Sequence, residues 1–211
     1  MIDPASLAVH RHVFDGLAVE TGDVLCTING APGSMAGAFW RGVGALVPGQ
    51  VDHTAIYIGP GGRCVEAGVN GVITYEMPGT TWDAEALHAT RGVLDQLYGV
   101  AIPLAGRETV LDEAAVRRGV AAYCLEAADR HAKYNVNFFA ADDDARFYCS
   151  QLVYRAYREF GIDLNTDDGV PGGRVLGRIV FPEEIWNTCA HTVSPRWSSP
   201  PRSSPKPRRR R

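Results

Sequence analysis

Cys149 and His53 are the side chains of this sequence that could together carry out nucleophilic chemistry. Apolar residues follow Cys149 at helical spacing, namely Leu152, Val153, Ala156 and Phe160, so Cys149 is expected in the first turn of a helix. Unpaired backbone N–H groups and the helix dipole stabilise a thiolate there. Such a thiolate can attack a carbonyl carbon, while N–H groups of the same turn bind the oxyanion. The alternative is that Cys149 only lines the apolar face.

His53 lies in an apolar, β-branched segment that is expected to form a strand, residues 51–58. A Gly-rich turn over residues 59–62 leads into a returning strand over residues 63–67. A histidine in such a strand is either a core residue with its hydrogen bonds satisfied or a general base. The returning strand decides which interpretation is favoured.

Glu66 is the candidate partner of His53. A four-residue turn pairs Ala55 with Glu66, and this register places Glu66 on the same face as His53, one diagonal step away. A carboxylate there can accept the imidazole N–H and fix its tautomer. A slip of one residue would instead turn Glu66 to the other face, as a carboxylate in water. Asp52 is next to His53 in sequence but points to the opposite face, so it is the weaker candidate.

The elements that must position these side chains follow from hydrophobic periodicity and turn residues. Strands are expected over residues 24–28, 51–58, 63–67 and 69–75, and helices over residues 114–132 and 149–160. Residues 34–47 are Gly-rich and apolar, which suits a short helix or a packed loop. Strands followed by helices favour an α+β domain.

Several motifs resemble those of the NlpC-type papain-like cysteine hydrolases. KYNVNFF (133–139) and RFYCSQLVYRAY (146–157) resemble the segment around the nucleophile, and HTAIYIG (53–59) with VEAG (65–68) resembles the histidine strand and the strand after it. Ordinary members place the cysteine before the histidine. The reversed order here, with GDVL at 22–25, resembles the circularly permuted branch, which includes YiiX-like proteins and lecithin:retinol acyltransferase-like enzymes.

The resemblance implies a permuted papain-like fold, in which an antiparallel sheet packs against helices and the catalytic cysteine begins a helix. It implies Cys149 as nucleophile, His53 as base and Glu66 as the third member of a triad. Tyr134 and Tyr148 would lie beside Cys149, where the oxyanion or the substrate binds; the alternative for Tyr134 is a core aromatic. No metal or organic cofactor is implied.

Two departures from the family pattern concern the substrate. Tyr148 stands where unpermuted members usually have Asp, and Gln151 where they usually have Gly. Permuted bacterial members tolerate an aromatic residue before the cysteine. The Asn-Cys-Glu-His signature of the acyltransferase-like enzymes is absent from the sequence, which argues against their substrate class.

The expected function is hydrolysis of an amide through a thioester, on a peptide, an isopeptide or a cell-wall peptide. A second hypothesis is a thioesterase, lipid acyl hydrolase or acyltransferase with the same triad, in which residues 35–47 would line an acyl pocket. A third is a non-catalytic domain that binds an anionic partner. No P-loop, GxGxxG turn or HExxH motif occurs in the sequence.

Length and composition suit one domain with its own core, since the chain has 211 residues, 45% of them apolar. We expect this domain over residues 13–192 and a disordered Pro/Ser/Arg-rich tail over residues 193–211. Seven basic side chains and no acidic one lie in residues 196–211, which leaves 14 basic against 24 acidic ones before them. The tail is either a solvated end or a contact to nucleic acid or another anionic surface.

Compartment is inferred from the cysteines and the start of the sequence. The five cysteines are scattered without a CxxC pair, so neither a zinc site nor a disulfide framework is indicated. The first residues do not resemble a signal peptide, and no apolar run is long enough for a membrane span. The sequence therefore predicts a cytoplasmic protein, or one exported by a leaderless route as an effector.

Overall fold

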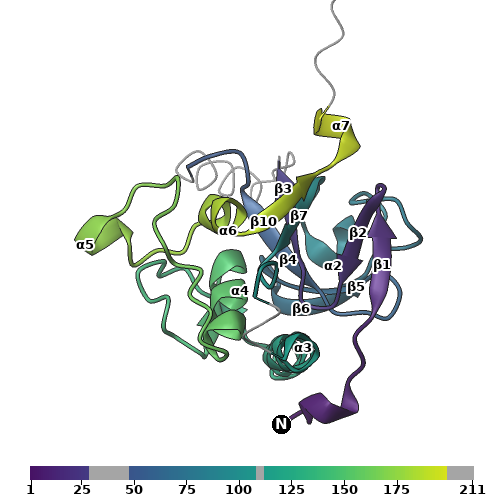
Figure 1. Cartoon of the computed structure of the whole chain (residues 1–211), viewed down its shortest axis with the longest axis horizontal. Helices are drawn as coiled ribbons and strands as arrows, with labels where there is room; N and C mark the ends of the chain where they lie inside the picture. The colour runs from purple at the N-terminus through teal and green to yellow at the C-terminus, as the bar shows by residue number, and fades with distance from the viewer. Residues whose placement is uncertain (29–47, 108–111, 199–211) are drawn as a thin grey trace, which may run out of the picture.

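An antiparallel sheet of six strands forms the centre of the protein (Figure 1). A computed structural model describes residues 1–28, 48–107 and 112–198. The strand order is β10-β7-β3-β4-β5-β6. In chain order these strands are β3 (Val24–Ile28), β4 (His53–Tyr57), β5 (Arg63–Gly68), β6 (Gly71–Glu76), β7 (Gln96–Ile102) and β10 (Ala190–Val193). With its several helices, the structure confirms the α+β class.

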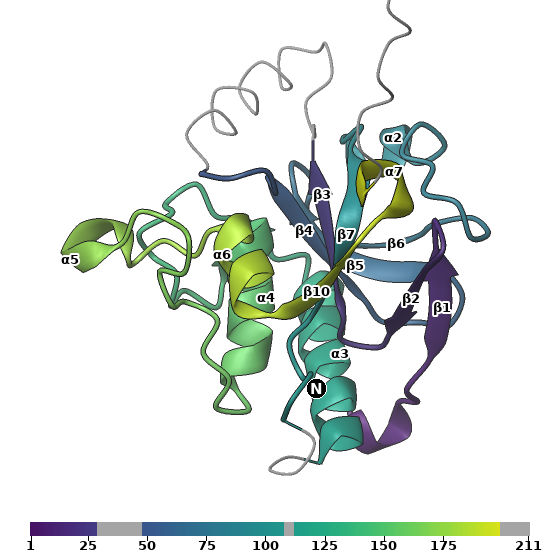
Figure 2. The same cartoon turned by 45° about the horizontal axis from the view of Figure 1, so that its top comes forward.

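Helices cover one face of the sheet and a small hairpin covers the other (Figure 2). The two main helices are α3 (Glu113–Asp129) and α4 (Cys149–Arg158), and the hairpin is β1 (Arg11–Phe14) with β2 (Leu17–Glu20). The remaining elements are η1 (Pro4–Ser6), α2 (His88–Arg91), β8 (Lys133–Tyr134), β9 (Arg146–Phe147), α5 (Gly173–Leu176), α6 (Pro182–Thr188) and α7 (Pro195–Ser198).

The alternation of side chains along the strands produces two apolar cores. Val24 and Ile56 pack under α3 and α4, whereas their neighbours Leu25 and Ala55 pack toward the hairpin. Because both faces are covered, the central strands carry apolar side chains on both faces. The apolar residues allowed strands β3, β4 and β5 to be predicted from sequence. The polar residues among them, such as His53 and Glu66, are exceptions that need hydrogen-bond partners.

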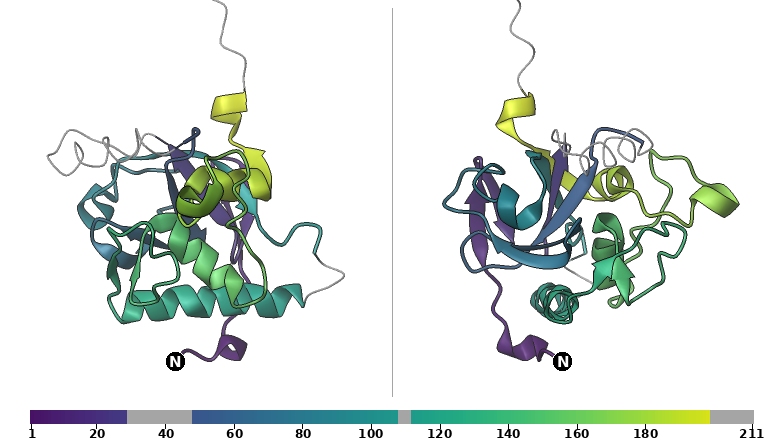
Figure 3. Two further views of the ribbon diagram at one scale, coloured as in Figure 1. Left: turned by 90° about the vertical axis from the view of Figure 1, so that its left-hand side faces the viewer. Right: turned by 180° about the vertical axis from the view of Figure 1, so that it is seen from behind.

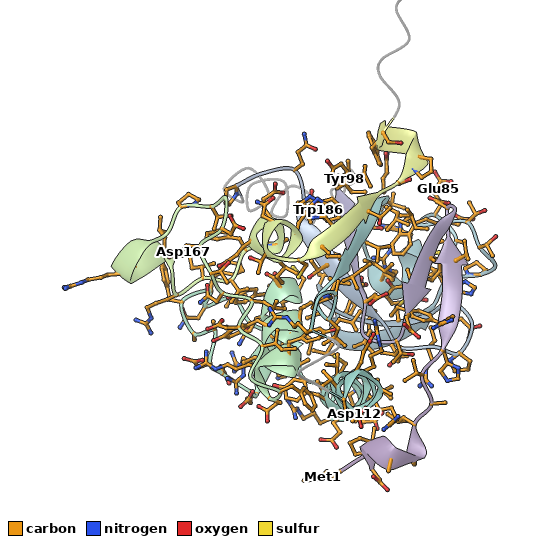
Figure 4. All side chains as sticks on the ribbon, viewed as in Figure 1. Met1, Glu85, Tyr98, Asp112, Asp167 and Trp186 are labelled. Carbon is orange, nitrogen blue, oxygen red and sulfur yellow. The ribbon has the colours of Figure 1, made fainter. Side chains whose placement is uncertain are left out.

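The edge strand β10 is joined to the sheet by aromatic contacts. Trp186 of α6 lies 5.1 Å from the ring of Tyr98 on β7 and stacks on His191 of β10 at 4.0 Å, and Figure 4 labels Tyr98 and Trp186 at this edge. Strand β7 was not predicted, and neither were β1, β2 and β10. Each of the three others has only four residues, too few for a clear alternation.

The ends of the expected domain differ from the elements in the structure. Strand β1 begins before residue 13, and η1 precedes it and lies against α3 (Figure 3). At the other end, α7 falls in the segment expected to be disordered, and its Trp197 Nε1 donates to the carbonyl of Leu97 at 3.0 Å. Residues 199–211 and the Gly-rich residues 34–47, with the acyl pocket expected at 35–47, lie outside the described residues.

Gln151 fixes the start of α4 through its side-chain hydrogen bonds. Its side chain is completely buried. Its Nε2 donates to three loop carbonyls, those of Ala140, Ala141 and Asp143. Its Oε1 accepts from the backbone N–H of Tyr148 at 3.2 Å and from Asn135 Nδ2 at 2.9 Å. The loop before β9 is thereby tied to the first turn of the helix that begins with Cys149.

We predict that Gln151→Met lowers the free energy of unfolding by about 2–4 kcal/mol, because it leaves buried carbonyls and N–H groups without partners. Urea denaturation followed by circular dichroism measures this loss. The same substitution at Gln50, whose residue is exposed, is the control and should change stability by less than about 0.5 kcal/mol. Equal effects of the two substitutions would contradict the role of the Gln151 amide.

Candidate active site

Cys149 is the first residue of α4, as the helical spacing predicted. The backbone N–H groups of Ser150 and Thr54 both donate to its sulfur. The N–H of Ser150 belongs to the first helical turn, where the backbone has no carbonyl partner within the helix. The sulfur therefore lies among donors that stabilise a thiolate more than a thiol. Only 8% of the Cys149 surface is exposed.

His53 is the first residue of β4 and contacts both other members of the predicted triad. Strand β5 pairs with β4 so that Ala55 is opposite Glu66, which confirms the predicted register. Nε2 of His53 lies 2.9 Å from Glu66 Oε2. His53 also hydrogen-bonds the side chain of Cys149, and because Nε2 faces Glu66, the sulfur is left to Nδ1. Among the two carboxylates considered from sequence, Glu66 is the one that binds this imidazole.

The three side chains come from different layers of the fold. Glu66 is on the sheet face that the hairpin covers, since it pairs directly with Ala55 of that core. Cys149 belongs to α4, which packs on the opposite face. His53 connects them because it is at the end of β4, where its side chain can meet both. Glu66 is completely buried, whereas 12% of the His53 side chain remains exposed.

The electrostatics of the cluster favour a thiolate and an imidazolium. Burial alone would raise the pKa of Cys149, but the hydrogen bond and positive charge of His53 lower it below the ordinary thiol value. Burial alone would lower the pKa of His53, but Cys149 and Glu66 together raise it well above its usual value. Both shifts favour the proton on nitrogen rather than on sulfur, which is the charge state that nucleophilic chemistry at a cysteine requires.

The two tyrosines expected beside the nucleophile have different surroundings. Tyr134 ends β8 and lies near Cys149, and its pKa is raised by burial and by the charge of that sulfur. Tyr148 comes directly before Cys149, but its hydroxyl accepts from the N–H of Val180 at 3.0 Å and donates to the carbonyl of Phe138 at 3.3 Å. Its hydroxyl thus holds two loops together.

Arg91 and Asp95 belong to the site but were not found from sequence. Arg91 is completely buried and binds the carboxylate of Glu66 on one side and that of Asp95 on the other. In sequence the two residues look like an ordinary i, i+4 pair on a helix surface. The indication that the sequence held for such a residue was Glu66 itself, because a buried carboxylate needs a partner of opposite charge.

Among residues 1–28, 48–107 and 112–198, no group of three or more His, Cys, Asp or Glu side chains is placed to hold a metal ion. The remaining cysteines are buried, and burial raises the pKa of Cys189 to about 12. No helix in these ranges is long and apolar enough to cross a membrane.

Comparison with known proteins gives no independent guide. No protein-family model matches the chain, and neither a curated protein nor a solved structure does. The interpretation of the site therefore depends on its own geometry and on the chemistry of its side chains.

Cys149 should react with iodoacetamide at least about 100-fold faster than Cys189 at pH 7. The two residues are almost equally exposed, 8% and 7%, so Cys189 is a control for access within the same molecule. Because the pKa of Cys149 is lowered, its labelling rate should level off at a lower pH than that of an ordinary thiol. Labelling of Cys189 should rise only toward pH 12.

Mass spectrometry of peptides after short exposures across pH measures both rates. His53→Ala should move the labelling of Cys149 to higher pH, since it removes the hydrogen bond and charge that stabilise the thiolate. Equal rates at the two cysteines, or a midpoint unmoved by His53→Ala, would contradict the thiolate–imidazolium pair.

Proposed function

We propose that the protein is a papain-like cysteine hydrolase of the circularly permuted NlpC type, which cleaves an amide bond through a thioester intermediate. The observation on which this depends is the hydrogen-bonded series of Cys149, His53 and Glu66 at the N-terminus of α4. The antiparallel sheet packed against helices is compatible with that fold.

In the first step the Cys149 thiolate attacks the carbonyl carbon of the substrate, and the carbonyl oxygen becomes an oxyanion. The backbone N–H of Cys149 is at the first helical position and has no partner within the helix, so it is available to this oxyanion. The imidazolium of His53 then gives its proton to the amine, the carbon–nitrogen bond breaks, and a thioester remains on the sulfur.

In the second step neutral His53 takes a proton from water, and the resulting hydroxide attacks the thioester carbonyl. The carbon–sulfur bond breaks, the carboxylic acid leaves, and the proton on His53 restores the starting ion pair. Glu66 contributes by accepting the Nε2–H bond throughout, which keeps Nδ1 facing the sulfur. Tyr134, whose pKa is raised by burial and by the charge of Cys149, is the side chain that we assign to substrate binding.

An acyl ester or thioester is the second candidate substrate. The segment directly after Tyr134 exposes two large apolar side chains, Val136 at 67% and Phe139 at 44%. Exposed apolar side chains so close in sequence to Tyr134 are suited to bind an acyl chain or an apolar peptide side chain. The leaving group differs between the two substrate classes, but the nucleophile and base are the same.

Hydrolysis should be found in a panel of peptide amides, isopeptides, muropeptides, acyl thioesters and phospholipids, and it should depend on the triad. Cys149→Ala is expected to lower turnover by about 10,000-fold or more, and Glu66→Gln by about 100-fold. The class that is turned over identifies the leaving group. With a slowly released substrate, mass spectrometry should show an acyl group on Cys149 in the wild-type protein.

Glu113→Gln is the matched control for Glu66→Gln, since Glu113 is also a carboxylate bound to a buried arginine, Arg117. It should leave turnover unchanged. Activity that survives Cys149→Ala, or the absence of hydrolysis of every class, would overturn the proposal.

A further inference from the structure

A buried arginine lies directly behind the acidic member of the triad. Arg91 Nε donates to Glu66 Oε1 at 3.0 Å, and its Nη2 donates to Glu66 Oε2 at 2.7 Å. The same Oε2 is the atom that faces His53. Arg91 therefore binds the Glu66 carboxylate through two hydrogen bonds. These two bonds fix the orientation of the carboxylate, and with it the direction from which Oε2 accepts the hydrogen bond of the His53 imidazole.

The guanidinium is itself held on every side. Asp95 accepts from Nη1 at 2.8 Å and from Nη2 at 2.9 Å. The ring centroids of Tyr75 and Trp82 lie 4.6 and 5.2 Å from the guanidinium carbon, in cation–π contact. Trp82 Nε1 also donates to Asp95 Oδ1 at 3.2 Å. Arg91 is completely buried, so this enclosure leaves its planar group no other orientation.

The charges require one another. Glu66 and Asp95 bind the same Nη2 and are both buried, so without the cation two carboxylates would repel one another and one would take up a proton. Burial opposes ionisation of both, but Arg91 lowers the pKa of Glu66 and of Asp95, and His53 adds to this. The other ionisable groups that interact with the cluster are Cys149, Tyr75 and Cys64.

We propose that Arg91 is a positioning residue of the active site: it keeps Glu66 ionised and aimed at His53 Nε2, so that Nδ1 of the imidazole meets Cys149. Asp95 supplies a second negative charge beside the buried Arg91 cation. If Glu66 were the single carboxylate bound to Arg91, its oxygens would be weaker hydrogen-bond acceptors for His53. The part of this inference that concerns turnover rests on the proposed hydrolase function. The part that concerns the thiolate does not.

The experiment compares the pH dependence of Cys149 alkylation by iodoacetamide in folded variants. Arg91→Met leaves two facing buried carboxylates and is expected to unfold, so the informative variant is Arg91→Met/Asp95→Asn, which removes one charge of each sign. It should lower the alkylation rate of Cys149 at pH 6 by at least about tenfold, because the His53 imidazolium loses its fixed acceptor. Arg91→Lys keeps the positive charge but cannot form the two parallel hydrogen bonds to Glu66. Its Cys149 alkylation rate should therefore lie between that of the double variant and that of the wild type.

Arg117→Met is the matched control. Arg117 is also buried, on α3, and binds the carboxylates of Asp23, Glu20 and Glu113. Its loss should lower stability and leave the alkylation profile of Cys149 unchanged. A merely structural role for Arg91 would give the same pattern as Arg117→Met.

An alkylation profile in Arg91→Met/Asp95→Asn that superimposes on the wild type would overturn the proposal. Should that variant fail to fold, Arg91→Lys decides, and an unchanged profile there has the same consequence. Turnover on the substrate panel is measured in parallel. If the wild-type protein hydrolyses none of these substrates, the proposed function is contradicted but the inference about Arg91 is not. The alkylation comparison still reports whether Arg91 controls the Cys149 thiolate.

Discussion

The buried charge of Glu66 is the constraint on which the site depends. A carboxylate without solvent needs hydrogen bonds and an opposite charge, and here it receives them from both sides, from His53 on β4 and from Arg91 at the end of α2. Because each partner belongs to a separate element, satisfying this one charge fixes where β4, β5 and α2 meet. The histidine is oriented by the same requirement that stabilises the fold.

Cys149 is positioned from the other face of the sheet. Gln151 ties the first turn of α4 to the preceding loop, and Ser150 Oγ donates to the carbonyl of Val180 at 2.7 Å. Both side chains are buried and directly follow Cys149. The sulfur is thus held by a network separate from the one that holds Glu66. The two networks meet at His53, which lies at the end of a strand, where it can reach both.

Much of the Cys149–His53–Glu66 cluster could be predicted from sequence because its determinants are local. Turn length sets the register of β4 and β5, and this is enough to place Glu66 beside His53; helical spacing is enough to place Cys149 at the start of α4. Arg91 could not be predicted in the same way, since its burial depends on β6 and on Trp82, far away in sequence. The short strands β1 and β10 likewise form because of packing between distant segments, and their own residues give little indication of it.

The most direct measurement of the central claim is the protonation state of His53, followed by NMR of labelled histidine side chains across pH and assigned with a His53→Gln variant. The account predicts that the His53 imidazole titrates well above the usual histidine range, and that Cys149→Ala lowers its pKa because the thiolate partner is lost. A His53 that titrates in the usual range and is unaffected by Cys149→Ala would contradict it.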